Sequence, residues 1–317
     1  MKKILIVGCG DIALRVARLL HPRYRLFGLA RNPARHTVLR EAGIVPIAGD
    51  LDLPASLHRL GGLADIVLHF APPPTALAGD TNETDSRTRN LIAALSQGRL
   101  PRRIIYISTS GVYGDCAGAE VAETRAISAQ SLRAKRRIDA ENKIRHWAAH
   151  SGVQANILRV PGIYSAERLP LERLRKGTPA LIASEDGYTN HIHADDLARI
   201  VVSALRYAKA NRVYHTADDS QMKMGDYFVA VADAFNLPPP PRVTRAVAQK
   251  VLSPMLLSFM NESRRLTNTR MKQELKMVMR YPTVAHTLAA IKQPGLVVSV
   301  APISALQPQT QLPLLLV

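Results

Sequence analysis

The chain begins with a short apolar run that ends in a glycine-rich turn, and this feature constrains the fold most strongly. Residues 4–7 are predicted to form a buried strand, and an amphipathic helix is predicted over 11–20. The turn between them is Gly8-Cys9-Gly10-Asp11-Ile12-Ala13. The first glycine permits a tight turn, and the second lets the backbone approach a pyrophosphate. A strand, this turn and a helix together predict a dinucleotide-binding unit.

Short apolar strands alternate with helical patterns from the start of the chain. This order predicts an α/β fold, a Rossmann doubly wound parallel sheet with a smaller, mainly helical C-terminal substrate part. The predicted strands are 4–7, 24–30, 44–48, 65–70, 103–108, 155–160 and 213–216. The predicted helices are 11–20, 34–42, 53–60, 83–97, 128–150, 194–208 and 224–235, and residues 243–292 are expected to be mainly helical.

These patterns divide the chain into three predicted parts. Residues 1–163 form a Rossmann dinucleotide-binding domain, to which residues 194–218 are expected to return. Residues 164–293 form the substrate-binding part. Residues 294–317 are an uncharged tail that is rich in proline, which argues against a membrane-spanning helix. We interpret this tail as an irregular appendage or an oligomer contact.

The chain is strongly basic, with 42 Lys and Arg against 25 Asp and Glu and a formal net charge of +17. Such a charge can attract nucleic acid, anionic lipid or phosphorylated small molecules. The basic residues are spread over several predicted helices, without the interleaved aromatic residues of a single-strand-binding face. We therefore favour solvated helix faces and attraction of a small anionic ligand. Binding of nucleic acid remains the less favoured alternative, and no membrane partner is expected.

Cysteine usage indicates a reducing compartment. Cys9 and Cys116 are too few for a disulfide framework, and the N-terminal apolar run is too short for a secretory signal. A cytoplasmic location is therefore expected. Because Cys9 lies at a helix N-terminus, its thiol could have a depressed pKa, but a small filler between two required glycines is the favoured interpretation.

The end of the second predicted strand indicates which dinucleotide is bound. An NAD site usually places Asp or Glu there, on the ribose hydroxyls. This chain has Arg31 and Asn32 instead, and Arg31, aided by Arg35, can pair with a 2′-phosphate. We therefore predict NADP(H) in preference to NAD(H), with Asp50 as a candidate for the adenine amino group. The alternative is that Arg31 is an ordinary surface residue.

Five stretches from the fourth predicted strand onward carry a family resemblance. They are His69-Phe70-Ala71-Pro72, Ile107-Ser108-Thr109-Ser110-Gly111-Val112-Tyr113-Gly114, Leu158-Arg159-Val160-Pro161-Gly162-Ile163-Tyr164, His191-Ile192-His193-Ala194-Asp195-Asp196-Leu197-Ala198 and Arg280-Tyr281-Pro282-Thr283. In their order and spacing the chain resembles the extended short-chain dehydrogenase/reductases, also called NAD-dependent epimerase/dehydratases. The resemblance implies that Ala71, Pro72 and Pro161 border the cofactor. It also implies a possible homodimer, because family members commonly pair through two helices.

The resemblance also implies catalytic positions. Thr109 matches the Ser or Thr that hydrogen-bonds the reacting carbonyl or hydroxyl in that family. The family normally adds a Tyr-x-x-x-Lys pair, whose tyrosine transfers a proton, but this chain lacks it. One alignment puts Arg133 and Arg137 at those places, and the other puts Ser131 and Lys135 there. Neither arginine nor an unactivated serine transfers protons well. Tyr113 is the nearest substitute in the sequence, with packing or substrate contact as its alternative roles.

The cluster of His191, His193, Asp195 and Asp196 has two interpretations. Imidazole and carboxylate are reasonable metal ligands. The resemblance instead implies a loop that opens a helix, so we expect no metal and expect Asp195 or Asp196 to cap that helix. His193 would then anchor the loop or contact substrate.

Together these features predict an NADP(H)-binding oxidoreductase, epimerase or dehydratase-like enzyme. Its expected substrate is a small polyhydroxylated or nucleotide-linked molecule. The alternative is a non-catalytic NADP(H)-binding redox sensor or scaffold that kept the fold without the Tyr/Lys pair.

Overall fold

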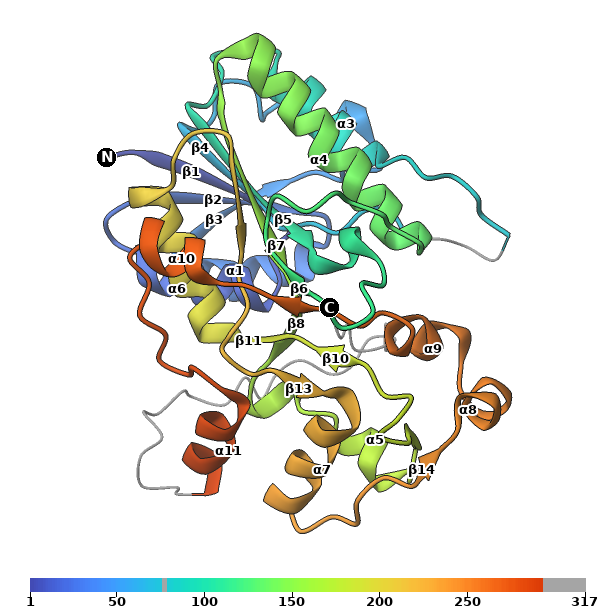
Figure 1. Cartoon of the computed structure of the whole chain (residues 1–317). Coiled ribbons are helices and arrows are strands. Elements are labelled where there is room, and N and C mark those ends of the chain that lie inside the picture. Colours follow the sequence, from blue (N-terminus) through green and yellow to red (C-terminus); the bar gives the residue numbers. More distant parts are fainter. Residues whose placement is uncertain (76–78, 293–317) are drawn as a thin grey trace.

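A parallel sheet forms the centre of the molecule (Figure 1). The computed structural model describes residues 1–75 and 79–292. Within these residues the sheet has seven strands, in the order β12-β7-β5-β4-β1-β2-β3. They are β1 (Lys3–Val7), β2 (Arg25–Ala30), β3 (Ile44–Ala48), β4 (Ile66–His69), β5 (Arg103–Thr109), β7 (Gln154–Val160) and β12 (Arg212–His215). The strand order reverses between β1 and β4, and ligands bind beyond the carboxyl ends of strands at such a point.

Helices cover both faces of this sheet, which confirms the predicted α/β class (Figure 1). Side chains alternate along each strand, so Ile4 packs with helices on one face and Leu5 with helices on the other. The first face carries α1 (Asp11–Leu20), α2 (His36–Glu41) and α6 (Ala194–Tyr207), and the second carries α3 (Ser86–Leu95) and α4 (Leu132–Ser151). Doubly covered strands explain the continuous apolar runs in the sequence.

A second, smaller part lies below the carboxyl edge of the sheet in Figure 1. Its core is built around buried Tyr227, Phe228 and Val231 of α7. Its helices are α5 (Leu171–Arg175), α7 (Met224–Ala234), α8 (Arg245–Val251), α9 (Pro254–Met260) and α11 (Val284–Lys292). Its short strand pairs are β8 (Gly162–Tyr164) with β11 (His191–His193), β9 (Ala180–Leu181) with β14 (Arg242–Val243), and β10 (Tyr188–Thr189) with β13 (Met222–Lys223).

Later segments of the chain return to the sheet. β12 pairs in parallel with β7, and α10 (Thr269–Glu274) packs beside β12. β15 (Arg265–Leu266) pairs with β6 (Glu120–Val121), which follows β5. This pairing brings residues near 262–266 to the carboxyl edge of β5, although they are far apart in the sequence.

Some predicted elements differ from the structure. The helix predicted over 53–60 is only a short 3₁₀ turn, Pro54–Leu57, because Pro54 begins it and Gly61 and Gly62 follow. The helices predicted from 83 and 128 begin later, after Asp85 and Ser131, whose side chains cap them. The mainly helical region 243–292 contains short helices separated by β15 and turns. The predicted tail, 294–317, lies outside the described residues.

No helix in residues 1–75 and 79–292 is long and apolar enough to cross a membrane.

Candidate cofactor and substrate site

The turn between β1 and α1 has the geometry of a phosphate loop. Gly8 has φ +95°, and a Cβ placed on it would lie 2.3 Å from the backbone nitrogen of Ala71. Only glycine fits this close approach to the chain after β4. A Cβ on Gly10 would instead meet no atom within 4 Å. The protein's own packing therefore leaves the space outside Gly10 open, where backbone can approach a pyrophosphate.

The N-terminus of α1 faces this open space with its N–H groups uncapped. Gly10 is the N-cap residue and has no side chain to accept hydrogen bonds from the first turn. Ile12 and Ala13 of that turn are buried against the sheet. The Asp11 carboxylate pairs with Arg15 at 3.0 Å and with Arg168 at 3.6 Å, which offsets its negative charge. The turn therefore fits an anionic phosphate group.

Cys9 is a packing residue in this loop. Burial raises the pKa of its thiol to about 12, against the smaller opposing effect of the Arg35 cation. Its sulfur lies next to the sheet, where a Cβ on Gly28 would come within 2.8 Å of it. The structure therefore favours the filler interpretation over a reactive thiolate.

The carboxyl ends of β2 and β3 bring together the residues predicted to hold the adenosine half. The Arg31 side chain is 69% exposed, and its Nε lies 4.0 Å from Oδ2 of Asp50. Asn32 caps the 3₁₀ turn Pro33–Arg35. Arg35 is held against the loop, because its Nη2 donates to the carbonyl oxygen of Cys9 at 3.1 Å. Arg31 can therefore move to meet a ligand, whereas Arg35 is already anchored.

Three further predicted residues border the sheet edge. Ala71 is buried, and its N–H donates to the carbonyl of Val7 at 2.9 Å. The carbonyl of Pro72 accepts a hydrogen bond from Arg87 at 3.2 Å, which fixes the chain after β4. Pro161 is buried between β7 and β8.

Thr109 and Tyr113 have different surroundings, although both follow β5. Thr109 is its last residue, lines a cleft at the sheet edge, and accepts a hydrogen bond from the N–H of Gly111 at 3.1 Å. Tyr113 is buried and is not among the residues that line the cleft. Its hydroxyl accepts from Arg159 at 2.7 Å and lies 2.6 Å from Nε2 of His215. Burial raises the pKa of Tyr113, and the Arg159 cation opposes this only in part.

The two alignments of α4 point to side chains with different surroundings. Arg133 lines the cleft together with Thr109, and Arg137 donates to the carbonyl of Ile107 at 2.5 Å. Ser131 is the N-cap of α4, and Lys135 pairs with Glu83 near the surface. Of these four residues, only Arg133 lines the cleft that Thr109 also lines.

The cleft lies between the sheet edge and the second part, with a volume of about 600 Å³ that includes open solvent. It is lined by Thr109, Ser110, Gly111, Arg133, Gly162, Tyr188, Thr189, Asn190, His191, Met224, Tyr227, Phe228, Phe259, Glu262 and Arg264. Glu262 and Arg264 form an ion pair of 2.8 Å, and Arg264 also donates to the carbonyl of Gly114 at 2.9 Å. The sequence analysis missed both, because only the β6–β15 pairing brings them to this edge.

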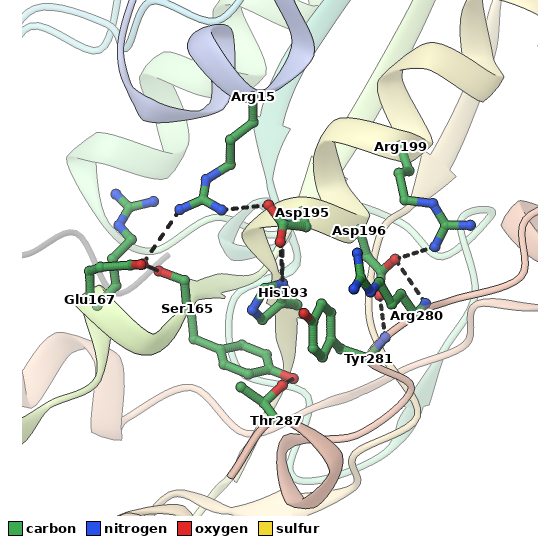
Figure 2. A network of polar contacts seen from close by, with 12 residues as sticks. Arg15, Ser165, Glu167, His193, Asp195, Asp196, Arg199, Arg280, Tyr281 and Thr287 are labelled. Carbon is green, nitrogen blue, oxygen red and sulfur yellow. Dashed lines mark hydrogen bonds and ion pairs between the residues drawn. The ribbon is translucent and has the colours of Figure 1, made fainter. Parts of the chain in front are cut away.

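The cluster around His193 is a polar link between the two parts (Figure 2). Arg15 of α1 pairs with Asp195 of α6 and, at 3.5 Å, with Glu167. The residue that caps α6 is His193, whose Nδ1 accepts from the N–H of Asp195 at 3.2 Å. The expectation that Asp195 or Asp196 caps this helix was therefore wrong, because both carboxylates have other partners.

Asp196 is fully buried and binds a late segment of the chain. Its carboxylate accepts from the N–H groups of Arg280 and Tyr281 at 2.9 and 2.7 Å, and from Arg199 at 2.7 Å. Figure 2 shows this second cluster beside the first. Across residues 1–75 and 79–292, no group of His, Cys, Asp or Glu side chains is arranged to hold a metal ion.

Comparison with known families assigns the chain to a nucleotide-binding family. The sequence matches the family model described as NAD(P)H-binding over residues 8–208, more than half of the chain. The chain belongs to the NAD(P)H-binding family. The match begins at Gly8 of the phosphate loop and includes Thr109 and α4. No curated protein matches this NAD(P)H-binding chain.

Solved structures match this NAD(P)H-binding protein over nearly its full length. A functionally unknown conserved protein from Silicibacter pomeroyi DSS is 28% identical, with a TM-score of 0.73, covering 92% of this chain and 98% of its own. UDP-glucuronic acid 4-epimerase from Bacillus cereus, in complex with NAD, is 19% identical with a TM-score of 0.70, covering 90% and 95%. UDP-N-acetylglucosamine 4-epimerase from the same organism is 16% identical with a TM-score of 0.69, covering 92% and 98%.

These matches confirm the resemblance inferred from the sequence motifs. This NAD(P)H-binding protein has the fold of the epimerases, with a parallel Rossmann sheet and a smaller C-terminal part. It departs from the resembling family's catalytic pattern, because its sequence has no Tyr-x-x-x-Lys pair.

Proposed function

We propose that this protein binds NADP(H) and acts as an oxidoreductase or epimerase/dehydratase-like enzyme on a small polyhydroxylated or nucleotide-linked substrate. The observation that carries the proposal is the position of Thr109. It ends β5 in a cleft at the carboxyl edge of the sheet, and Gly162, after β7, lines the same cleft. The nucleotide-linked sugars named for two of the structural neighbours support this substrate class.

The preference for NADP(H) rests on Arg31. Its exposed guanidinium lies at the end of β2, where a 2′-phosphate can be met by a cation. The chain has no acidic residue at this strand end to hold free ribose hydroxyls, since Arg31 and Asn32 follow β2 directly.

Thr109 would hold the reacting oxygen, and Glu262 is the candidate for proton transfer. An arginine at position 133 cannot take the role of a tyrosine, because a guanidinium keeps its proton at ordinary pH. Glu262 supplies a carboxylate on the same cleft, close to Gly111 and Thr109. Its Oε2 is paired with Arg264, which leaves Oε1 to accept a proton from a substrate hydroxyl.

A second function is favoured by the surroundings of Tyr113. The family's Tyr-x-x-x-Lys pair is absent from the sequence, and the hydroxyl of Tyr113, its nearest substitute, is bonded inside the protein and does not reach the cleft. A non-catalytic NADP(H)-binding redox sensor or scaffold would need only the cofactor loop. This alternative shares cofactor binding with the first proposal and differs in lacking turnover.

The first test is cofactor binding to the full chain, measured as the rise in unfolding temperature with NADPH and with NADH. We expect a larger rise with NADPH. If neither nucleotide raises the unfolding temperature, the proposal is wrong. A larger rise with NADH would contradict the assignment of Arg31.

The second test separates enzyme from sensor. NADPH oxidation is measured with a panel of carbonyl compounds and sugar nucleotides, for the wild type, Thr109→Ala and Thr109→Ser. We expect Thr109→Ala to lose activity roughly hundredfold, as removal of a transition-state donor does, and Thr109→Ser to retain most of it. Thr124→Ala is the matched control, because Thr124 is exposed and does not line the cleft. Cofactor binding without any turnover would favour the sensor.

A further inference from the structure

Unpartnered polar atoms collect on the walls of the cleft. Within residues 1–75 and 79–292, the buried side-chain atoms without a hydrogen-bond partner include Arg133 Nε, Arg264 Nε, His191 Nδ1 and the Tyr227 hydroxyl. All four residues line the cleft. Buried polar groups are nearly always hydrogen-bonded, so such a cluster needs an explanation. Arg264, His191 and Tyr227 are buried, so of these four residues only half-buried Arg133 offers a side chain that is partly open to the cleft.

Arg133 is the most conspicuous of these residues. Its guanidinium lies 4.2 Å from the ring of Phe259, and among the described residues it makes no hydrogen bond and no ion pair. Burial lowers the pKa of Arg133, and the Glu262 charge opposes this, while the cations of Arg137 and Arg264 add to it. A guanidinium stays charged even so. A half-buried cation is therefore held on the cleft wall without a counter-ion of its own.

The charges on the cleft wall do not balance. Arg133 and Arg264 are cations, and Glu262 is the one carboxylate among the described lining residues. That carboxylate lies 2.8 Å from Nη1 of Arg264, so it is already engaged. Burial lowers the pKa of His191 to about 3, so its ring is neutral at pH 7. One positive charge, on Arg133, is left over.

We propose that the cleft binds a substrate that carries an oxyanion, a carboxylate or phosphate group, and that Arg133 holds this group. A guanidinium presents a planar fork of donors that matches either oxyanion. The walls around Arg133 are formed by Arg264, His191 and Tyr227, which line the same cleft. This inference rests on the proposed function, because it names the substrate class of the same cleft.

The replacement of tyrosine by arginine thus has a specific meaning. In the alignment that matches Arg133 to the family's tyrosine, this chain places a fixed charge beside Thr109 where the family has a proton-transfer group. The site has exchanged a proton donor for an anion-binding group.

The binding test uses four probes on the full chain at constant ionic strength, with and without NADPH. Gluconate and sorbitol share a carbon chain and differ in the carboxylate, and glucose 6-phosphate and glucose differ in the phosphate. Binding is measured by calorimetry and by the rise in unfolding temperature. We expect at least one anion to bind more tightly than its neutral match, and the better anion identifies the group. Equal binding within both pairs, or no binding of either anion, would overturn the inference.

The variant test uses Arg133→Met, Arg133→Lys and a control, Arg125→Met, which removes the same charge from an exposed position. Loss of Arg133 is expected to weaken anion binding roughly tenfold to hundredfold, the effect of losing a charged hydrogen-bonding pair. The anion affinity of Arg133→Lys should lie between those of the wild type and Arg133→Met. The anion affinity of Arg125→Met should equal that of the wild type. Undiminished anion binding by Arg133→Met would overturn the inference.

A stability measurement separates ligand binding from a structural role. Because Arg133 has no polar partner in the described protein, the ligand-free Arg133→Met variant should unfold at the wild-type temperature or above it. Only the rise caused by the anion should be lost. A large drop in the ligand-free unfolding temperature would assign Arg133 a structural role instead.

The two proposals can fail separately. If neither dinucleotide binds but gluconate or glucose 6-phosphate requires Arg133, the proposed function is wrong and the anion site stands. If NADPH binds and the anions show no dependence on Arg133, the anion site is wrong and cofactor binding stands.

Discussion

Arg159 donates a hydrogen bond of 2.7 Å to the hydroxyl oxygen of Tyr113, and both side chains are buried. The same guanidinium forms two hydrogen bonds with Glu141, from Nε at 3.1 Å and from Nη2 at 2.7 Å. Nδ1 of His215 lies 2.9 Å from the carbonyl of Thr267 and must donate to it, so Nε2 of His215 accepts from Tyr113. The Tyr113 hydroxyl is therefore fully used inside the protein.

Tyr113→Phe should lower stability and leave turnover unchanged. The substitution removes one partner each from Arg159 and His215, which are buried, and an unsatisfied buried group costs about 1–3 kcal/mol. Urea unfolding measures the loss. Tyr207→Phe is the control, because the Tyr207 side chain is largely exposed. Normal stability with lost activity would instead support proton transfer by Tyr113.

Alanine at the two loop glycines should have different effects. Gly8→Ala places a Cβ 2.3 Å from the Ala71 nitrogen at a positive φ, so it should destabilise the fold by several kcal/mol. Gly10→Ala meets no protein atom within 4 Å and should fold normally but lose dinucleotide affinity, roughly tenfold or more. Unfolding curves and NADPH titrations on both variants test this. Unchanged NADPH affinity in Gly10→Ala would show that the pyrophosphate lies elsewhere.

Arg31→Ala should weaken NADPH binding roughly tenfold and leave NADH binding unchanged, because only NADPH carries a 2′-phosphate. Asp50→Asn should strengthen NADPH binding, since it removes a carboxylate 4.0 Å from Nε of Arg31. Fluorescence titration with both nucleotides measures these affinities. The exposed Arg23→Ala is the charge-matched control. A parallel loss for both nucleotides in Arg31→Ala would rule out selection by this residue.

Stability should fall in mild acid. Burial lowers the pKa of His69, His191 and His215 to about 3 and that of His193 to about 4. The unfolded chain takes up these protons near pH 6.5, whereas the folded chain does not. The free energy of unfolding should therefore decrease as pH falls from about 6.5 to about 4, by up to ~1.4 kcal/mol per pH unit for each imidazole.

His69→Gln tests this pH dependence at one site. It removes one titrating ring, so the drop in unfolding free energy between pH 7 and pH 5 should become smaller. Thr88→Ala removes the hydrogen-bond partner of His69 but keeps the ring, so it should lower stability without changing the pH dependence. Equal pH dependence in the wild type and His69→Gln would contradict the assignment.

The sequence predicted the sheet well because its strands are buried on both faces and therefore read as uninterrupted apolar runs. It also predicted the phosphate loop, where Gly8 has a steric requirement that is local to the turn and to the chain after β4. The prediction of a helix over 53–60 was wrong. The segment forms a short 3₁₀ turn that begins at Pro54, and its apolar residues pack into the core. Local periodicity could not reveal this tertiary packing.

Only some of the residues that line the cleft could be predicted from the sequence. Thr109 was found through a motif, but Glu262 and Arg264 follow α9 in a segment with no motif of its own. They reach the cleft because β15 pairs with β6, a contact between residues more than a hundred positions apart. The place of Arg133 on the cleft wall was equally hidden, because the sequence left two alignments of α4 open.

The contact between Arg15 and Asp195 has a consequence for the modularity of this protein. It joins positions 180 residues apart, in α1 and α6, whose apolar faces also pack together. A fragment ending at residue 163 would lose α6 and β12, and would leave the apolar stripe of α1 open to water. The packing of α1, the helix that follows the phosphate loop, is therefore completed by α6, which comes much later in the sequence. The cofactor-binding half is not a portable unit, and grafting it onto another substrate part would require carrying α6 and β12 with it.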